Sequence, residues 1–174
     1  MKNFSVYEIL EILASNNGKK FKEQKLHEFS NNKTLQKALY LAYNPTTQFY
    51  IRKIPSFTSS DKSQISLDEA LDSLQKLSNR EVTGNAASQF LKELLEKLDK
   101  NDGIVIQRVI NKDLKCGINA TTINKIFGKG FIKETPYMGA ISYNKKKVKK
   151  LFEESSEVVS EIKMDGRYIK SRRL

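Results

Sequence analysis

The sequence predicts a mostly α-helical domain over residues 1–130, followed by the truncated start of a mixed α/β unit over residues 131–174. Apolar residues recur at helical spacing through the first three quarters of the chain, and capping residues flank most of these stretches. The best strand pattern, Val-Val-Ser-Glu-Ile at 158–162, comes only near the end. A chain of 174 residues can build one domain with a core, or one domain and the beginning of another.

Helices are expected throughout the segment that precedes Pro45. The apolar positions from Phe4 to Leu13 follow helical spacing and stop at Asn-Asn-Gly, residues 16–18. A second helix is expected over residues 19–29. A third begins near Asn32 and ends before Asn-Pro, because proline disfavours a helical conformation in the residue before it.

The middle of the chain alternates loops and helices. An aromatic and aliphatic segment follows Pro45, and Phe49 and Tyr50 are expected to lie in the core. The serine-rich stretch 56–66 is expected to be a surface loop. Ser66 and Glu69 stand at capping-box spacing before an apolar stripe, which predicts the start of another helix.

Further helices are predicted before residue 130. The longest follows the sequence Thr-Gly-Asn at 83–85. Asp102 is expected to cap the next one, and Thr121 or Thr122 to start a short helix that Gly128 closes.

The composition favours polyanionic partners. A net charge of +11 promotes phosphate binding through neutralisation and counterion release, although the same charge can simply keep a protein soluble. A single cysteine, Cys116, excludes an internal disulfide and is expected in the core, whereas His27 is expected at the surface; no cluster predicts a metal site. No signal peptide or membrane-spanning apolar run is recognised, so we expect a cytoplasmic protein without a membrane partner.

One short motif suggests covalent chemistry. In Glu-Ile-Lys-Met-Asp-Gly, residues 161–166, the predicted strand ends in Lys163 just before a glycine turn. A lysine with a lowered pKa can attack an α-phosphorus and retain AMP as a phosphoramidate. Asp165 could orient the amine or lie near a magnesium ion. On these residues alone, an ordinary hairpin with an Asp-Gly turn is the alternative.

The wider sequence resembles a known family. Lys163, Asp165 and Gly166 look like the nucleophile motif K-x-D-G-x-R of the ATP-dependent DNA ligases of T-even bacteriophages. Upstream blocks resemble, in the same order and spacing, that family's helical DNA-binding domain and the segment leading into its adenylation (nucleotidyltransferase) domain: residues 38–53, 77–87, 108–117 and 136–140.

This resemblance implies an activity and its cofactors, ATP and Mg²⁺. Lys163 would become AMP-lysine, the AMP would pass to the 5′-phosphate of a nick, and the 3′-hydroxyl would displace it to seal the strand. The residues expected around the cofactor are Glu161, which would read the adenine, Ile162, Asp165, Gly166 and Arg167. The helical domain would grip nicked double-stranded DNA along its backbone without base preference.

A second group of residues is expected to contact the DNA. They flank the Asp113-Leu114 turn or lie near the next helix start, where backbone amides can bind a phosphate: Arg108, Lys112, Lys115, Gly117, Asn119, Thr121 and Lys125. Asp113 is expected to be a turn or cap residue. The lysine run at 145–150 either contacts phosphates between the domains or forms a solvated face of a helix.

Two features depart from the family pattern. The family motif has arginine two positions after the glycine, where this sequence has Tyr168 and places Arg167 one position early. The chain also ends eleven residues after Lys163, before the rest of a nucleotide pocket. We therefore expect this polypeptide to bind DNA but not to seal nicks alone, with a second chain carrying the rest of the ligase as a candidate partner. The alternatives are a non-catalytic DNA-binding or regulatory protein derived from a ligase, and an inert remnant.

Overall fold

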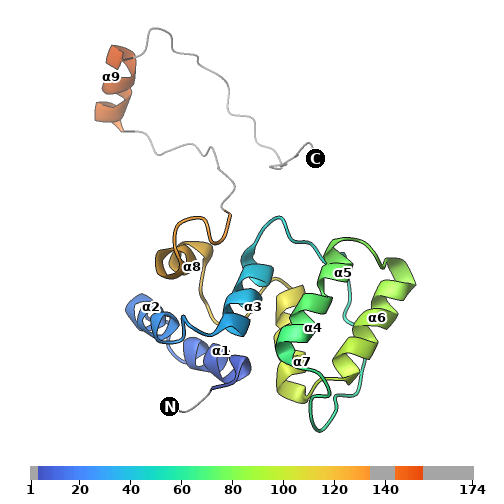
Figure 1. Cartoon of the computed structure of the whole chain (residues 1–174). Helices are drawn as coiled ribbons and strands as arrows, with labels where there is room; N and C mark the ends of the chain where they lie inside the picture. Colours follow the sequence, from blue (N-terminus) through green and yellow to red (C-terminus); the bar gives the residue numbers. More distant parts are fainter. Residues whose placement is uncertain (1–3, 134–143, 155–174) are drawn as a thin grey trace. The chain divides into compact units, whose positions relative to one another are not determined.

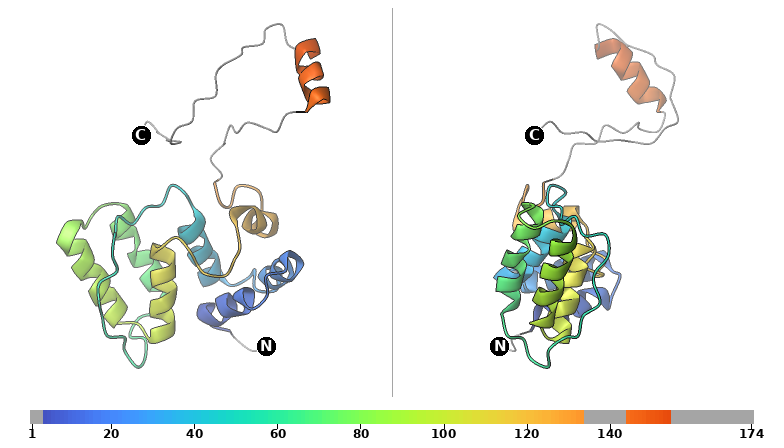
Figure 2. Two further views of the ribbon diagram at one scale, coloured as in Figure 1. Left: turned by 180° about the vertical axis from the view of Figure 1, so that it is seen from behind. Right: turned by 90° about the vertical axis from the view of Figure 1, so that its right-hand side faces the viewer.

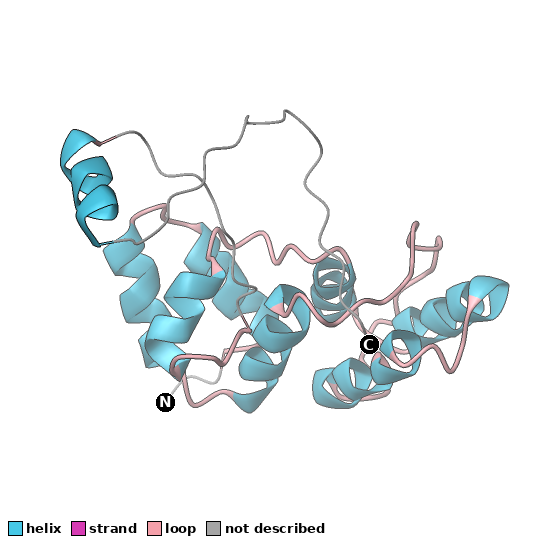
Figure 3. Cartoon of the chain, turned by 90° about the horizontal axis from the view of Figure 1, so that it is seen from above, coloured by secondary structure: helices cyan, strands magenta, loops and turns pink. Residues whose placement is uncertain are grey.

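The computed structural model describes residues 4–133 and 144–154, and the chain divides into two units, Met1–Thr135 and Pro136–Leu174. The described residues form α-helices joined by loops and contain no strand (Figures 1 and 3). The helices are α1 (Val6–Ala14), α2 (Lys19–Glu28), α3 (Lys33–Tyr43), α4 (Leu67–Ser73), α5 (Gln75–Ser78), α6 (Gly84–Glu96), α7 (Lys100–Ile110), α8 (Ala120–Phe127) and α9 (Lys145–Glu154). The expectation of a mostly helical chain is confirmed for these residues.

Part of the sequence-based prediction falls outside the described residues. This applies to the strand expected at 158–162 and to every expected cofactor residue: Glu161, Ile162, Lys163, Asp165, Gly166 and Arg167. The start of an α/β adenylation domain therefore stays a prediction.

In the first unit, α7 lies at the centre of the core. It packs against α1, α3 and α4. Figures 1 and 2 show α1 and α2 on one side of this unit and α6 on the other, with α3 between them. The buried side chains of α7 include Val105, Ile106, Val109 and Ile110. Full burial of one such side chain contributes about 1.5–3 kcal/mol, so this face is a main source of the unit's stability.

Local sequence signals explain several helix ends. At the start of α4 the Ser66 hydroxyl accepts a hydrogen bond from the Glu69 N–H (3.2 Å), and the Glu69 carboxylate accepts one from the Ser66 N–H (2.9 Å), which is the expected capping box. A second capping box, of Ser5 and Glu8, begins α1. Gly128 ends α8 with a φ of 105°, as expected.

Two predicted helix caps are wrong. Asp99 caps α7, and its carboxylate accepts the Asp102 N–H at 2.9 Å, so Asp102 lies inside the first turn. Asn119 caps α8, and its side chain accepts the Thr122 N–H at 2.9 Å; Thr121 and Thr122 are therefore inside the helix. In both cases the cap is the earlier residue, because a cap has an extended backbone and bonds amides two or three positions later.

Tyr50 lies at the surface, which corrects the expectation that it belongs to the core. Its side chain is 62% exposed, whereas Phe49 is buried as expected. The Tyr50 backbone has a φ of 56°, a conformation that turns the chain, so the burial of its neighbour does not extend to it. The Arg80 guanidinium covers the Tyr50 ring at 4.9 Å from the centroid.

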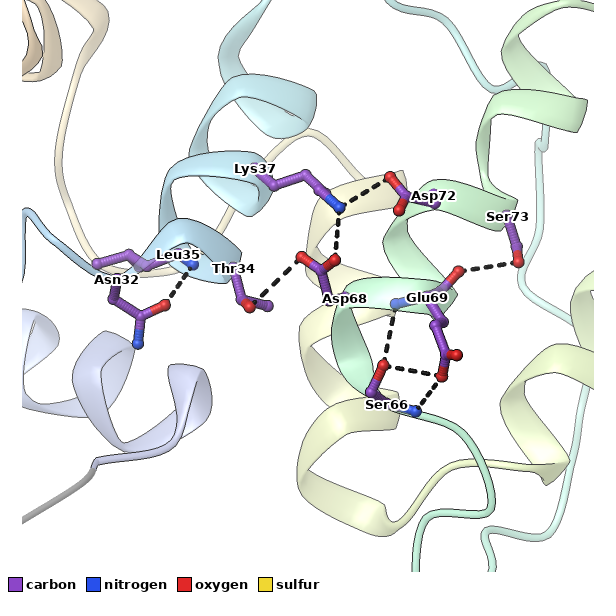
Figure 4. A network of polar contacts seen from close by, with 9 residues as sticks. All are labelled: Asn32, Thr34, Leu35, Lys37, Ser66, Asp68, Glu69, Asp72 and Ser73. Carbon is purple, nitrogen blue, oxygen red and sulfur yellow. Dashed lines mark hydrogen bonds and ion pairs between the residues drawn. The ribbon is translucent and has the colours of Figure 1, made fainter.

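A polar network joins α3 to α4 (Figure 4). Lys37 of α3 forms ion pairs of 2.8 Å with Asp68 and with Asp72 of α4. The Thr34 hydroxyl lies 3.4 Å from Asp68. Because these side chains are partly exposed, such pairs contribute about 1 kcal/mol or less. The apolar core, and not this network, therefore holds the two helices together.

The second unit contains α9, which is the helix expected around the lysine run. The Asn144 side chain caps it by accepting the Lys146 and Lys147 N–H groups at 3.0 and 3.2 Å. Its lysines are largely exposed, which fits a solvated face, and a phosphate contact stays a prediction. In the described part of the chain, no helix is both long and apolar enough to span a bilayer.

Candidate nucleic-acid interface

The loop between α7 and α8, residues 111–119, has an unusual backbone. Positive φ angles occur at Lys112 (58°), Lys115 (57°) and Gly117 (63°). For residues other than glycine this conformation costs about 1 kcal/mol or more, so the surrounding contacts must hold the loop. Within the loop, the Asp113 carboxylate accepts the Lys115 N–H at 2.9 Å, which is the turn role expected for Asp113.

Arg108, near the end of α7, bridges three elements. Its guanidinium lies 2.8 Å from the Glu11 carboxylate of α1 and donates to the Leu114 carbonyl oxygen of the loop at 3.4 Å. It also lies over the Tyr7 ring at 5.5 Å from the centroid. Only 19% of the side chain is exposed. Arg108 thus has a structural role, and its predicted DNA contact has no support from this arrangement.

Lys112 turns its amine toward the end of α3. The amine donates to the carbonyl oxygens of Leu41 (2.6 Å) and Asn44 (3.1 Å) and lies 5.2 Å from the centre of the Phe49 ring. Burial lowers the pKa of Lys112 to about 8. Since helix-terminal carbonyls lack partners within the helix, Lys112 satisfies groups that α3 leaves open. Its predicted contact with DNA is not supported by this geometry.

Lys22 of α2 is a residue of the candidate interface that the sequence analysis missed. Its side chain is 5% exposed, and its amine donates to the carbonyl oxygens of Cys116 (2.8 Å) and Gly117 (3.1 Å). A Cβ atom on Gly117 would overlap this amine, so the position requires glycine for its space as well as for its φ. One signal could have revealed Lys22: it lies four residues before the buried Leu26, on the same face of α2.

A hollow of about 220 Å³ lies at the start of α8. Its lining includes two lysines and no carboxylate: Asn17, Lys19, Lys22, Gly117, Ile118, Asn119 and Thr122. The first amides of a helix carry a partial positive charge that attracts anions. The hollow therefore brings together the start of α8, the amines of Lys19 and Lys22, and the loop residues Gly117 and Asn119. This arrangement is suitable for binding a phosphate.

The other predicted contact residues lie at the outside of the loop and of α8. Lys115 is 68% exposed and pairs with Asp113 at 2.7 Å, and the side-chain hydrogen bond from Lys115 lowers the pKa of Asp113. Lys125 is 61% exposed and pairs with Glu23 of α2 at 2.6 Å. Thr121, in the first turn of α8, is exposed as well.

Cys116 and His27 have the predicted environments. Cys116 is buried, its burial raises the pKa of its thiol, and its sulfur lies 3.8 Å from the Tyr43 hydroxyl. His27 is exposed. Within residues 4–133 and 144–154, no three His, Cys, Asp or Glu side chains are grouped as a metal ion would require.

Comparison with known proteins relates the chain to one family. Residues 44–128 match the family model described as DNA ligase N terminus. The chain is 32% identical over 148 residues to the DNA ligases of Enterobacteria phages T4 and T6, over 83% of this chain and 30% of each relative. This chain is a homologue of the amino-terminal part of phage DNA ligases. The resemblance noted in the sequence is thus confirmed, and the ligase homologue spans about 30% of the length of these relatives.

Solved structures extend the relationship to the fold. Those named Pmar-Lig_PreS3 and Pmar-Lig_Pre. each match the ligase homologue with a TM-score of 0.65 and 30% sequence identity, over 71% of this chain and 29% of theirs. The family match at 44–128 begins just after α3, covers α4 to α8 completely and includes the whole loop at 111–119. The α7–α8 loop and α8 therefore lie within the matched region, whereas Asn17, Lys19 and Lys22 of the hollow lie outside it.

Proposed function

We propose that this chain supplies the amino-terminal, duplex-gripping region of a DNA ligase and binds the DNA backbone through the α7–α8 loop and the start of α8. The observation that carries this proposal is the hollow beside the α8 start, in which Lys19 and Lys22 accompany the helix amides. Backbone phosphates accept hydrogen bonds from exposed lysines and helix-start amides without revealing base identity, and the positive charge of a buried lysine attracts an anion without contact. A net charge of +11 supports binding to a polyanion.

The proposed contact groups are those that solvent can reach. The exposed side chains are Lys115, Thr121 and Lys125, and the loop residues Gly117 and Asn119 are exposed as well. Each lysine that neutralises a phosphate releases a counterion, so binding should weaken steeply with salt. Nicked double-stranded DNA is the proposed substrate, in keeping with a ligase relative.

Salt-dependent binding tests this proposal. We expect labelled duplexes of two unrelated sequences to bind equally, with the logarithm of the binding constant falling linearly with the logarithm of salt concentration. Lys115→Ala and Lys125→Ala should each reduce that slope by about one. Lys100→Ala is the matched control, because Lys100 is exposed at the opposite end of α7. An absence of binding at low salt, or an unchanged slope in both variants, would contradict the proposal.

We also propose that the ligation chemistry uses Lys163. Its amine would attack the α-phosphorus of ATP, form a P–N bond and release pyrophosphate, with Mg²⁺ offsetting the phosphate charge. Around the adenylate would lie Glu161, Ile162, Asp165, Gly166 and Arg167. A second chain carrying the remaining length of the relatives is the proposed partner.

Labelling with α-³²P ATP tests the chemistry. We expect no stable adduct on the isolated chain. When a polypeptide that carries the remaining length of the relatives is added, we expect an adduct that Lys163→Ala abolishes. An adduct on the isolated chain would contradict the need for a partner. An adduct that survives Lys163→Ala would contradict the choice of nucleophile.

A further inference from the structure

We infer that Lys22 and Lys112 are positioning residues that hold the α7–α8 loop in place and do not bind phosphate themselves. Lys22 binds the backbone of the loop, and Lys112, which belongs to the loop, binds the backbone at the end of α3. This inference rests on the proposed DNA-binding function and deepens it, because it separates the cations that shape the interface from those that touch the ligand.

The two lysines act at opposite ends of one short loop. Lys112 lies at its start and donates to Leu41 and Asn44, which fastens the loop to the end of α3. Lys22 reaches from α2 to the carbonyl oxygens of Cys116 and Gly117, which fastens the second half of the loop. The loop is thus held to two different helices by amines that stem from separate parts of the chain.

The acceptors of these amines are carbonyl oxygens. Neither Lys22 nor Lys112 pairs with a carboxylate among the described residues. Taking an ammonium group out of water is unfavourable, and carbonyl oxygens satisfy its donors without neutralising its charge. No carboxylate partner among the described residues therefore offsets Lys22 where it lines the hollow, although its side chain is only 5% exposed.

The backbone of the loop explains why such contacts are needed. Lys112, Lys115 and Gly117 all have positive φ, and two of them are not glycine. Left-handed residues return to commoner conformations unless surrounding contacts oppose the change. Loss of either amine should therefore let the loop relax, so that its uncharged backbone amides no longer lie where a phosphate can meet them, whereas the exposed Lys115 keeps its phosphate contact.

Two readouts test the inference. The first is the salt dependence of duplex binding by Lys22→Met and Lys112→Met, with Lys115→Met for comparison and Lys100→Met as the exposed control. We expect Lys22→Met and Lys112→Met to bind about tenfold more weakly at every salt concentration with an unchanged slope. Lys115→Met should instead reduce the slope by about one, because it removes a phosphate contact.

The second readout uses Cys116, the single cysteine of the chain, whose carbonyl oxygen accepts from Lys22. Under native conditions we expect Cys116 in the Lys22→Met variant to be alkylated at least about tenfold faster than the rate expected from global unfolding of that variant. The reason is that local opening of the loop exposes the thiol. Ser66→Ala is the matched control: it weakens the start of α4, so Cys116 labelling should change only as far as global stability does.

Each outcome decides between the roles. A slope reduced by about one in Lys22→Met would identify Lys22 as a phosphate contact and overturn the inference. Wild-type protein that fails to bind DNA would sink the proposed function, while Cys116 labelling would still report on the loop. If Lys22→Met does not fold, Lys22→Gln removes the charge but keeps an N–H donor, and the same slope criterion applies.

Discussion

The amine of Lys22 occupies the space that a side chain on Gly117 would need. It donates to the Gly117 carbonyl oxygen at 3.1 Å, and a Cβ atom on Gly117 would overlap it. The loop conformation and the position of Lys22 are therefore coupled, although the two residues belong to distant parts of the chain. A change at one position must move the other.

Gly117→Ala should destabilise the protein by about 2–3 kcal/mol, because it adds steric overlap with Lys22 to the cost of a left-handed alanine. Gly84→Ala is the matched control. Gly84 has a similar φ of 57°, and a Cβ there would meet nothing within 4 Å, so it should lose only about 1 kcal/mol. Urea unfolding of both variants measures the difference. Equal losses would show that the overlap with Lys22 is relieved without cost.

Lys112 should make stability depend on pH in the weakly alkaline range. Its pKa is about 8 in the folded protein and about 10.4 in an unfolded chain. Between these values the unfolded state binds more protons, so the free energy of unfolding rises with pH. We expect a rise of about 1 kcal/mol from pH 8 to pH 9.5, after allowance for partial exposure.

Lys112→Met is the comparison for this pH effect. In this variant the free energy of unfolding, measured by urea titration at each pH, should rise less between pH 8 and pH 9.5 than in the wild type. Measurements should stop near pH 9.5, since burial raises the pKa of Tyr43 and stability is lost where an unfolded tyrosine begins to ionise. A rise that is equal in wild type and variant would assign the effect to another group.

Glu23→Gln should strengthen DNA binding by about threefold to tenfold, because it releases Lys125 from its 2.6 Å ion pair and removes a negative charge beside α8. Urea unfolding must accompany the binding measurement, because the Glu23 side chain is only 16% exposed although that of Lys125 is 61% exposed. Glu28→Gln is the control: Glu28 also lies on α2 and pairs with Lys25, so it gives the same charge change at another place. If both variants bind equally tightly, net charge alone explains the gain.

Ser66→Ala should lower stability by about 1 kcal/mol, because the first turn of α4 loses the hydroxyl that accepts the Glu69 N–H. The backbone hydrogen bond from Ser66 lowers the pKa of Glu69, so the capping contribution is present above the ordinary pKa of a glutamate and is lost as the pH falls below it. Thermal unfolding measures both effects. Ser73→Ala, at the other end of α4, should be nearly neutral.

Much of the helical architecture could be predicted because its signals are local. The apolar spacing of α1 and α3 and the capping box at Ser66 depend on residues within a few positions of each other. The caps of α7 and α8 were predicted slightly late, since several polar residues compete there and only the backbone conformation decides between them. The prediction for Tyr50 was wrong for a similar reason, because its exposure follows from a left-handed backbone conformation that the neighbouring residues do not reveal.

The site was harder to predict because it depends on distant contacts. The loop at 111–119 was recognised from its residues, yet the inward direction of Lys112 follows from the open carbonyls at the end of α3. Lys22 meets Cys116 across 94 residues of sequence, and no local pattern reports such a contact. Charge and motif thus indicate a candidate interface, whereas the contacts of each lysine or arginine in it follow only from the packing.

A loop that the protein already holds rigid has little left to order when a ligand arrives. Lys22 and Lys112 fasten the α7–α8 loop in the free protein. The conformational entropy of the loop is therefore lost during folding, and its loss does not weaken the binding of a ligand. Such a surface cannot remodel itself around different bases. It is suited to the feature that every duplex repeats, the regular spacing of its phosphates.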